Sequence, residues 1–428
     1  MTTETVPTAP IPTASVGRYR WVICGLLFAA NAINYIDRQA IGVLKPTLQA
    51  EFGWTEVTYG DIVFWFQAAY AIGYIVFGGL IDRIGARFGY ALAVGIWTVA
   101  HMAHAGASSV LSFMLVRFGL GIGEAGNFPA GLKAVAEWYP KRERALAVGI
   151  FNAGTNIGAV ITPLIVPAVT LAYGWRAAFL ITGLFSVIWI IVWLIVYKRP
   201  AEQPKVSAAE LAYIQSDPPD PAKAMPWLSL LPYRETWAYA LGKFLIDPIW
   251  FIFLFWLPDF FSKRYGLDLA SFGPPLVAVY LISDVGSVAG GWLSSHLIKR
   301  GRTINVARKT TMLICAIAVT PVMFAMYADT VWLAVALVGL ATAGHQGFSA
   351  NLYTLPSDVF PRRAVASVVG IGGMLGSVGG MLMAKYVGYV LEEIGSYTPI
   401  LVVAGCVYLL ALLVIHILMP RLTPVEMK

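Results

Sequence analysis

The segment VRFGLGIGEAGNFPAGLKAVAEWYP, residues 116–140, is apolar enough to cross a bilayer, yet it contains two charged side chains inside its apolar run. Arg117 and Glu124 are separated by about two helical turns, so both project from one face of a helix, roughly 10 Å apart along its axis. A charge at membrane depth is costly and usually faces a partner or a water-filled cavity. We therefore interpret this pair as part of a functional site.

The composition of the chain is that of an integral membrane protein. Of its 428 residues, 58% are hydrophobic and only 12% are charged, whereas a soluble globular domain has about 25% charged residues. The net charge of +7 is therefore read by its location along the chain and not as a sign of nucleic-acid binding. The three cysteines lie in apolar segments, and no HExxH, CxxC or P-loop motif occurs. We expect no cofactor, no metal, no nucleic-acid partner and no enzymatic activity, in a monomer surrounded by lipid.

Apolar windows of about 20 residues predict twelve membrane-spanning helices. A polar, proline-rich interruption follows the sixth, so the predicted fold is an all-α membrane protein with two six-helix halves. The predicted spans are 19–44, 58–80, 89–107, 111–137, 144–171, 177–197, 237–262, 272–298, 309–327, 331–356, 364–391 and 398–419. The predicted domains are a disordered tail (1–18), an N-terminal bundle (19–197), a linker (198–236), a C-terminal bundle (237–419) and a second tail (420–428).

The distribution of Lys and Arg predicts the orientation of these spans. With both termini inside, 21 of the 30 basic residues fall in cytoplasmic connections and four in external ones. Cytoplasmic loops of membrane proteins carry such an excess. We therefore expect both termini and the linker to lie in the cytoplasm.

The two halves read as copies of each other. A shift of 221 residues aligns EWYPKRERALAVGIFNAGTNIG (137–158) with DVFPRRAVASVVGIGGMLGSVG (358–379), with Pro, Arg and Gly in register. The same shift places Glu124 on His345. Parallel halves with a substrate site between them near the midplane are a transporter architecture.

The first predicted span ends in NAINYIDRQAIGVL (31–44), where Asn31, Asn34 and Arg38 recur at helical spacing and form a polar stripe. Asp37 lies about 100° round the helix from Arg38, so the two can face different neighbours. Arginine can grip both oxygens of a carboxylate, and a buried carboxyl can exchange protons near neutral pH. The alternative is a helix end that emerges into water with an ordinary surface ion pair.

The connection FGGLIDRIGARFG (77–89) carries Asp82, Arg83 and Arg87 among glycines. Its spacing resembles the G-x-x-x-D-[RK]-x-G-x-[RK] loop of the major facilitator superfamily. An acid at this helix end can pair with bases on a neighbouring helix and latch the cytoplasmic side shut. The alternative is simple anchoring by positive charge.

Several motifs together resemble the anion:cation symporter family of that superfamily over essentially the whole chain. They are NYIDR in the first span, Arg117 with Glu124, PAGLKAVAEWYP and SDVFP; KFLIDPIW and the His-Gln of the tenth span are most similar to hexuronate (glucuronate/galacturonate) transporters. The resemblance implies a twelve-helix bundle of two pseudo-symmetric halves in the bacterial inner membrane. It also implies proton-coupled import of a small organic anion by alternating access.

The resemblance also implies roles for single residues. Arg38 would bind the substrate carboxylate, Asp37 and Glu124 would carry protons, and Arg117 would pair with an acid as its charge changes. Tyr70 matches a substrate-facing tyrosine, whereas Thr155 stands where galactonate transporters place a glutamine, a departure that counts against galactonate as the substrate. The other candidate substrate-binding residues are Asn34, His345 and Gln346.

Some readings remain open from the sequence alone. Lys243 and Asp247 form a structural ion pair or line the cavity, and Asp284 has the same two readings. His345 either binds a sugar hydroxyl or packs as a neutral histidine, and we interpret His101 and His104 as packing or interhelical hydrogen-bonding residues. The alternative functions are a symporter or exchanger of another carboxylate, such as an aldonate, glucarate, tartrate or an aromatic acid, and, less favoured, a membrane enzyme or a transporter-like sensor.

Overall fold

The structure, a computed structural model, describes residues 17–217 and 225–425, and for residues 82, 141, 145 and 362 it describes the backbone only. The described residues form helices and no strand, which confirms the predicted all-α class. Nearly all of the predicted tail 1–18 lies outside the described residues. The α-helices are α1 (Tyr19–Phe52), α2 (Glu56–Ala103), α3 (Val110–Ala125), α4 (Asn127–Trp138), α5 (Lys141–Tyr173), α6 (Trp175–Val196), α7 (Ala208–Ile214), α8 (Arg234–Phe255), α9 (Leu257–Tyr265), α10 (Gly273–Lys299), α11 (Ile304–Val319), α12 (Val331–Leu352), α13 (Leu355–Val359), α14 (Arg362–Glu393) and α15 (Thr398–Leu418). The 3₁₀ helices are η1 (His104–Gly106), η2 (Pro200–Glu202), η3 (Trp227–Ser229) and η4 (Thr320–Tyr327).

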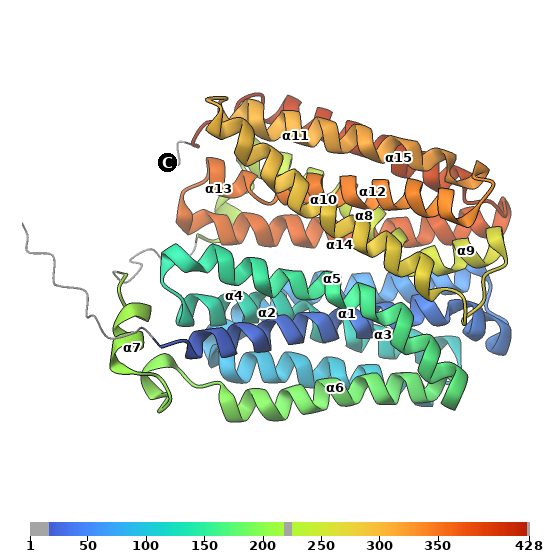
Figure 1. The fold of residues 1–428 in the computed structure, drawn as a ribbon, viewed down its shortest axis with the longest axis horizontal. Coiled ribbons are helices and arrows are strands. Elements are labelled where there is room, and N and C mark those ends of the chain that lie inside the picture. Colours follow the sequence, from blue (N-terminus) through green and yellow to red (C-terminus); the bar gives the residue numbers. More distant parts are fainter. Residues whose placement is uncertain (1–16, 218–224, 426–428) are drawn as a thin grey trace, which may run out of the picture.

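Two bundles of roughly parallel helices lie side by side (Figure 1). Helices α1 to α6 form one half and α8 to α15 form the other. The start of α1, the end of α15 and α7 lie at one end of the molecule, which we call the linker end. Helix α9 lies at the opposite end, which we call the far end.

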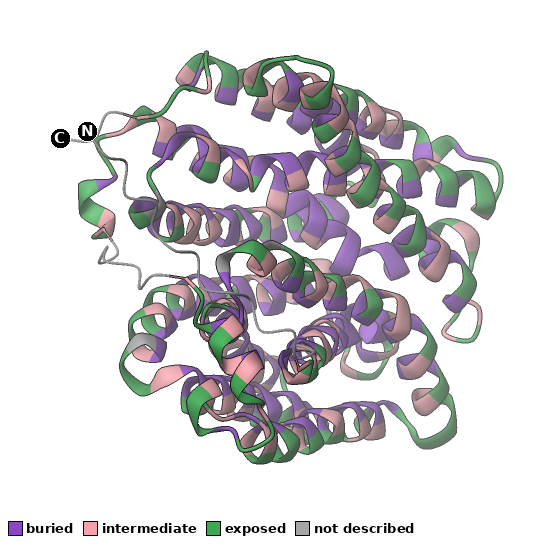
Figure 2. Cartoon of the chain, turned by 60° about the vertical axis from the view of Figure 1, so that its left-hand side comes forward, coloured by how far each residue is buried: buried purple, intermediate pink, exposed green. Residues whose placement is uncertain are grey.

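The surface of the bundle is apolar. Exposed residues cover the outward sides of the peripheral helices, and buried residues gather between the helices (Figure 2). The exposed set includes large aliphatic side chains such as Val99, Leu171 and Val288. Apolar side chains on the outside and polar ones inside are what a lipid environment favours, because lipid offers no hydrogen bonds.

Nine helical segments in the described part of the chain are long and apolar enough to cross a membrane. Three predicted spans lie outside this set. Span 19–44 lies in α1, span 89–107 in the C-terminal part of α2 with η1, and span 111–137 in α3 and α4. Helix α1 is rich in buried polar and charged residues, and α3 has only 16 residues. The total of twelve spans therefore stays a prediction.

Two local features of the backbone shape the first half. Gly85 has φ 83° and ψ 164°, a conformation that glycine adopts at no steric cost, and it divides α2 into two arms. The predicted span 111–137 is divided by a turn at Gly126, because α3 ends at Ala125 and α4 begins at Asn127. Pro129 has no N–H to donate to the carbonyl of Ala125, so one bond of a continuous helix is missing there.

Candidate functional site

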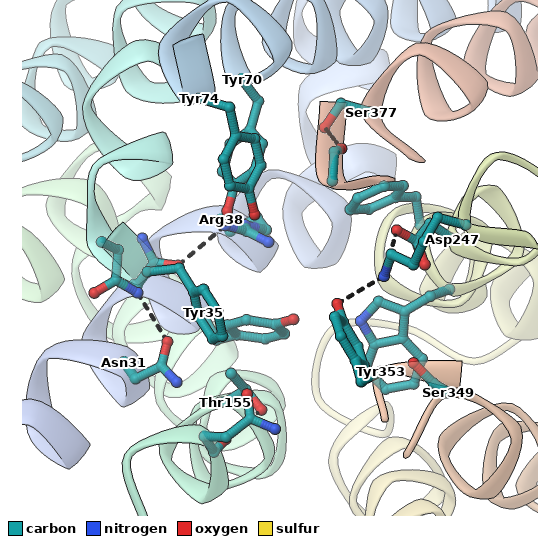
Figure 3. A pocket seen from close by; sticks show the side chains of 18 of the residues that line it. Asn31, Tyr35, Arg38, Tyr70, Tyr74, Thr155, Asp247, Ser349, Tyr353 and Ser377 are labelled. Atoms are coloured by element: carbon teal, nitrogen blue, oxygen red, sulfur yellow. Dashed lines mark hydrogen bonds and ion pairs between the residues drawn. The ribbon is translucent and has the colours of Figure 1, made fainter. Parts of the chain in front are cut away.

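A pocket of about 140 Å³ lies between the two halves. Figure 3 shows its two walls facing each other. Helices α1, α2, α4 and α5 supply one wall, and α8, α12 and α14 supply most of the other. The lining residues are Asn31, Asn34, Tyr35, Arg38, Tyr70, Tyr74, Asn127, Phe128, Asn152, Thr155, Lys243, Asp247, Trp250, Phe251, His345, Gln346, Ser349, Tyr353, Gly373 and Ser377.

Arg38 is the cation of the N-terminal wall. Its Nε donates to Oε2 of Glu124 at 2.7 Å, and its Nη2 donates to Oδ1 of Asn34 at 3.1 Å and to the Tyr70 hydroxyl at 3.2 Å. The guanidinium carbon also lies 4.9 Å from the centre of the Tyr35 ring, a distance typical of a cation–π contact. These contacts fix the guanidinium at the pocket wall, with Glu124 behind it.

Lys243 is the cation of the C-terminal wall. Its Nζ lies 2.7 Å from Oδ2 of Asp247 and donates to the Tyr353 hydroxyl at 2.6 Å. The sequence left open whether Lys243 and Asp247 pair or line the cavity, and the structure places them in both roles. Both walls therefore carry a cation that is already paired with a carboxylate.

His345 packs flat against Trp250 in the same wall, with ring centres 5.1 Å apart and planes inclined by 8°. Its Nδ1 forms a hydrogen bond of 2.6 Å with the Tyr408 hydroxyl. Gln346 also lines the pocket, and so do Asn34, Tyr70 and Thr155 of the first half. The structure thus brings all six candidate substrate-binding residues, Arg38 included, to one pocket.

Arg117 and Glu124, the pair that opened the sequence analysis, are fully buried but do not line the pocket. Nη2 of Arg117 donates to the backbone carbonyl of Arg38 at 3.1 Å, and its guanidinium lies 4.7 Å from the centre of the Phe66 ring. Nε and Nη1 of Arg117 and Oε1 of Glu124 have no hydrogen-bond partner among the described residues. Two buried charged groups thus keep unused hydrogen-bonding capacity directly behind Arg38.

Asp37 faces away from the pocket, as its angular separation from Arg38 predicts. Its Oδ2 accepts the Ser186 hydroxyl at 3.0 Å, and its Oδ1 lies 3.2 Å from Nε2 of His101. Asp37 and His101 are both fully buried. The adjacent residues Asp37 and Arg38 of α1 therefore face different surroundings: Arg38 lines the pocket, and Asp37 contacts buried residues on the other side of the helix.

The sequence missed several lining residues. Tyr353 and Ser349 continue the line of His345 along α12 at intervals of four residues, so helical spacing could have found them. Tyr35 stands inside the quoted NYIDR motif. No sequence signal identified Ser377, because only packing brings α14 to this position.

The predicted latch at the linker end stays a prediction. The side chain of Asp82 lies outside the described residues, and Arg83 is exposed. Nη2 of Arg87 donates to the carbonyl of Leu194 at 2.6 Å, which ties it to α6 of its own half.

The far end contains an ion-pair cluster that the sequence did not reveal. Nζ of Lys45 in α1 lies 2.7 Å from Oε2 of Glu56 and 2.9 Å from Oδ2 of Asp259 in α9. Lys263 lies 3.2 Å from the same Asp259 oxygen and also pairs with Glu56. Burial alone would lower the pKa of Lys263, but the carboxylates of Asp259 and Glu56 outweigh it and raise that pKa. We call these four residues the far-end latch, because they join the two halves.

Backbone packing closes the same end. A methyl group on Gly60 of α2 would come within 2.7 Å of the Ala384 carbonyl oxygen in α14, and one on Gly42 would come within 2.8 Å of the Leu254 carbonyl oxygen in α8. Only glycine allows backbones to approach so closely. Ion pairs and close backbone packing therefore both close the far end of the interface.

Comparisons with known proteins agree with this architecture. The family profile described as "Major Facilitator Superfamily" matches residues 27–384. The hexuronate transporter of Escherichia coli (strain K12) is 33% identical over 415 residues, which is 95% of each chain. The D-galactonate transporter of Escherichia coli O6:H1 is 30% identical, over 94% of this chain and 96% of that one. A crystal structure of a bacterial homolog to the human lysosomal transporter Spinster, in an inward-facing and occupied conformation, covers 94% of this chain and 96% of its own at 18% identity, with a TM-score of 0.71.

Proposed function

Because this chain belongs to the Major Facilitator Superfamily and is a multi-pass transporter of the bacterial inner membrane, not an enzyme, we propose that it imports a sugar acid, most specifically a hexuronate, together with protons. The names of its relatives point to this substrate class, since they include hexuronate, D-galactonate and galactarate/D-glucarate transporters. The observation that carries the proposal is the contact between Arg38 and Glu124 at the pocket wall.

The chemistry of the pocket suits a sugar acid. Such a molecule has one carboxylate, several hydroxyls and an apolar ring face. Arg38 can receive the carboxylate, side chains such as Asn34, Thr155 and Gln346 can bond hydroxyls, and the Trp250 ring offers an apolar face. The polar groups converge from both halves, so a bound solute would touch both.

The charge balance of the pocket favours uptake of a proton with the anion. Arg38 is already neutralised by Glu124, and Lys243 by Asp247. A further carboxylate in this low-dielectric site would be uncompensated and costly. A proton on Glu124 removes its charge and frees Arg38 for the substrate, so the carboxylate of the sugar acid replaces that of the protein.

Alternating access is supported by the closed far end of the interface between the two halves. The far-end latch and the glycine contacts close the interface at one end. With the orientation that the Lys and Arg distribution predicts, the linker end faces the cytoplasm and this structure is closed toward the outside. The opposite state, open toward the outside, requires the far-end latch to open.

Uptake into liposomes that contain only this protein tests the proposal. A panel of glucuronate, galacturonate, galactonate, glucarate and tartrate is offered with and without an inward proton gradient. We expect the gradient to drive accumulation of a hexuronate above its external concentration and to alkalinise the medium. Accumulation of another acid would establish one of the alternative substrates, and counterflow that no proton gradient affects would establish an exchanger and contradict proton coupling.

A further inference from the structure

A buried cluster lies behind α1, on the side away from the pocket. Its centre is Asp37 with His101 of the second arm of α2, and Oδ1 and Nε2 are 3.2 Å apart. Both side chains are fully buried, and neither lines the pocket. We call them the Asp37–His101 pair. The family resemblance implies that Asp37 carries a proton, but neither the resemblance nor the proposed function gives His101 a part.

Hydroxyl groups of α6 hold this pair in a defined arrangement. The Thr182 hydroxyl donates to the carbonyl of Ala178 at 2.8 Å, so its oxygen accepts Nε2–H of His101 at 2.7 Å. The Ser186 oxygen accepts Nε1–H of Trp97 at 3.2 Å, so its own proton points to Asp37. With these directions Oδ2 of Asp37 accepts the Ser186 proton, Oδ1 accepts no hydrogen bond from any described residue, and His101 is neutral with its proton on Nε2.

The pair has an open position for one more proton. Nδ1 of His101 makes no hydrogen bond to any described residue, although it is buried. A buried polar atom without a partner is costly, and such atoms in native structures call for an explanation. Nδ1 can take up a proton to give an imidazolium beside the Asp37 carboxylate, or Asp37 can be protonated at Oδ1. Either way the pair gains one proton and its charge changes from −1 to 0.

We propose that His101 is the positioning partner of Asp37 and that the two hold one exchangeable proton together. This inference rests on the proposed proton coupling. It adds to Glu124 a second proton-binding site, which is a carboxylate–imidazole pair. Such a proton can be bound and released with little movement of the two side chains, because Oδ1 and Nε2 lie 3.2 Å apart and both Oδ1 and Nδ1 are without a hydrogen bond to any described residue. His101 therefore tunes the pH at which Asp37 takes up its proton.

The other charged or titratable groups around the pair come from two elements. Arg117 and Glu124 of α3 act on it electrostatically with opposite signs, and His104 of η1 is the third group. Helix α6 contributes hydroxyls and the Phe179 ring, which carry no charge.

His104 offers a matched control three residues away. It is as buried as His101, but its Nδ1 bonds backbone carbonyls, at 2.9 Å to Ala100 and 3.1 Å to His101. Its ring stacks on Phe179 with centres 4.8 Å apart. A substitution here disturbs the packing of a buried histidine without removing the partner of Asp37.

Infrared titration of the purified full-length protein tests the pair without any substrate. The protonated carboxyl band of Asp37 is identified by its loss in Asp37→Asn and followed against pH. We expect His101→Gln, which keeps a donor but cannot titrate, to move the midpoint of that band by about one pH unit or more, and His104→Gln to leave it in place. An unchanged midpoint in His101→Gln, or an equal shift in His104→Gln, would overturn the proposal.

Transport by the same variants separates the pair from the proposed function. We expect His101→Gln to lose proton-driven accumulation by about tenfold and to shift its pH profile, with hexuronate counterflow retained. His104→Gln is expected to keep the wild-type profile. If the wild-type protein shows no proton-driven uptake, the proposed function fails, while the infrared result still decides whether the pair exists. A wild-type pH profile in His101→Gln would mean that the histidine only packs.

Discussion

The two halves share a helical frame but differ in where they keep their acids. In the first half Glu124 stands behind Arg38, and Asp37 lies in a second buried site. In the second half the position related to Glu124 by the repeat is His345, which bonds the Tyr408 hydroxyl. One acid of that half, Asp247, lies in the pocket wall beside Lys243. The acids of the two halves therefore lie in different surroundings, behind Arg38 in the first half and in the pocket wall in the second.

The largest effect is expected from the acid that only the first half has. Glu124→Gln should abolish proton-driven accumulation, because the amide cannot bind and release the proton that frees Arg38. Counterflow should remain measurable in the same liposomes. His345→Gln is the matched control in the second half and should keep accumulation. Unchanged proton-driven accumulation by Glu124→Gln would contradict the proposal that the first half couples transport to protons.

Arg38 is expected to give the next largest effect. Arg38→Ala removes a charge-assisted pair of donors for the substrate carboxylate, so hexuronate binding should weaken by about 100-fold. Binding to the detergent-purified protein, measured by calorimetry, checks this without transport. Gln346→Ala, in the facing wall, should weaken binding far less. Unchanged affinity in Arg38→Ala would rule out its role as the carboxylate site.

Lys243 tests whether the second half also binds the anion. Lys243→Ala should weaken binding by about tenfold, because it leaves the Asp247 carboxylate uncompensated in the pocket. The double variant Lys243→Ala with Asp247→Asn should recover most of the affinity, since it removes both charges. If the double variant stays as weak as the single one, Lys243 contacts the substrate directly and the two halves are more alike than we propose.

The smallest effect is expected at the far-end latch, because other contacts also close that end. Asp259→Asn removes one charge between Lys45 and Lys263, and we expect it to raise the share of molecules open at the far end by about threefold. Spin labels at Ala50 and Ala270, on opposite halves, would report the opening as a longer distance. Asp268→Asn is the control, since the carboxylate of Asp268 bonds Ser271 in its own loop and forms no ion pair with any described residue. An unchanged distance distribution in Asp259→Asn would mean that packing alone closes this end.

Much of the fold could be predicted from the sequence, because hydropathy and helical spacing are local properties. The apolar windows identified the helices, and the repeat identified two related halves. The same windows missed the break near Gly126, since they count apolar residues and do not weigh the missing N–H of Pro129. They also ended the first span at residue 44, although α1 continues to Phe52.

The sequence by itself determined which residues have polar chemistry inside a membrane. Arg38, Glu124 and Asp37 stood out because a charge in an apolar run needs a partner. The identity of each partner was decided only by the tertiary structure. Glu124 lies 86 residues from Arg38, and Asp259 lies more than 200 residues from Lys45. Helix spacing orders side chains within one helix, whereas an ion pair between helices depends on how the helices pack, and that is a property of the whole bundle.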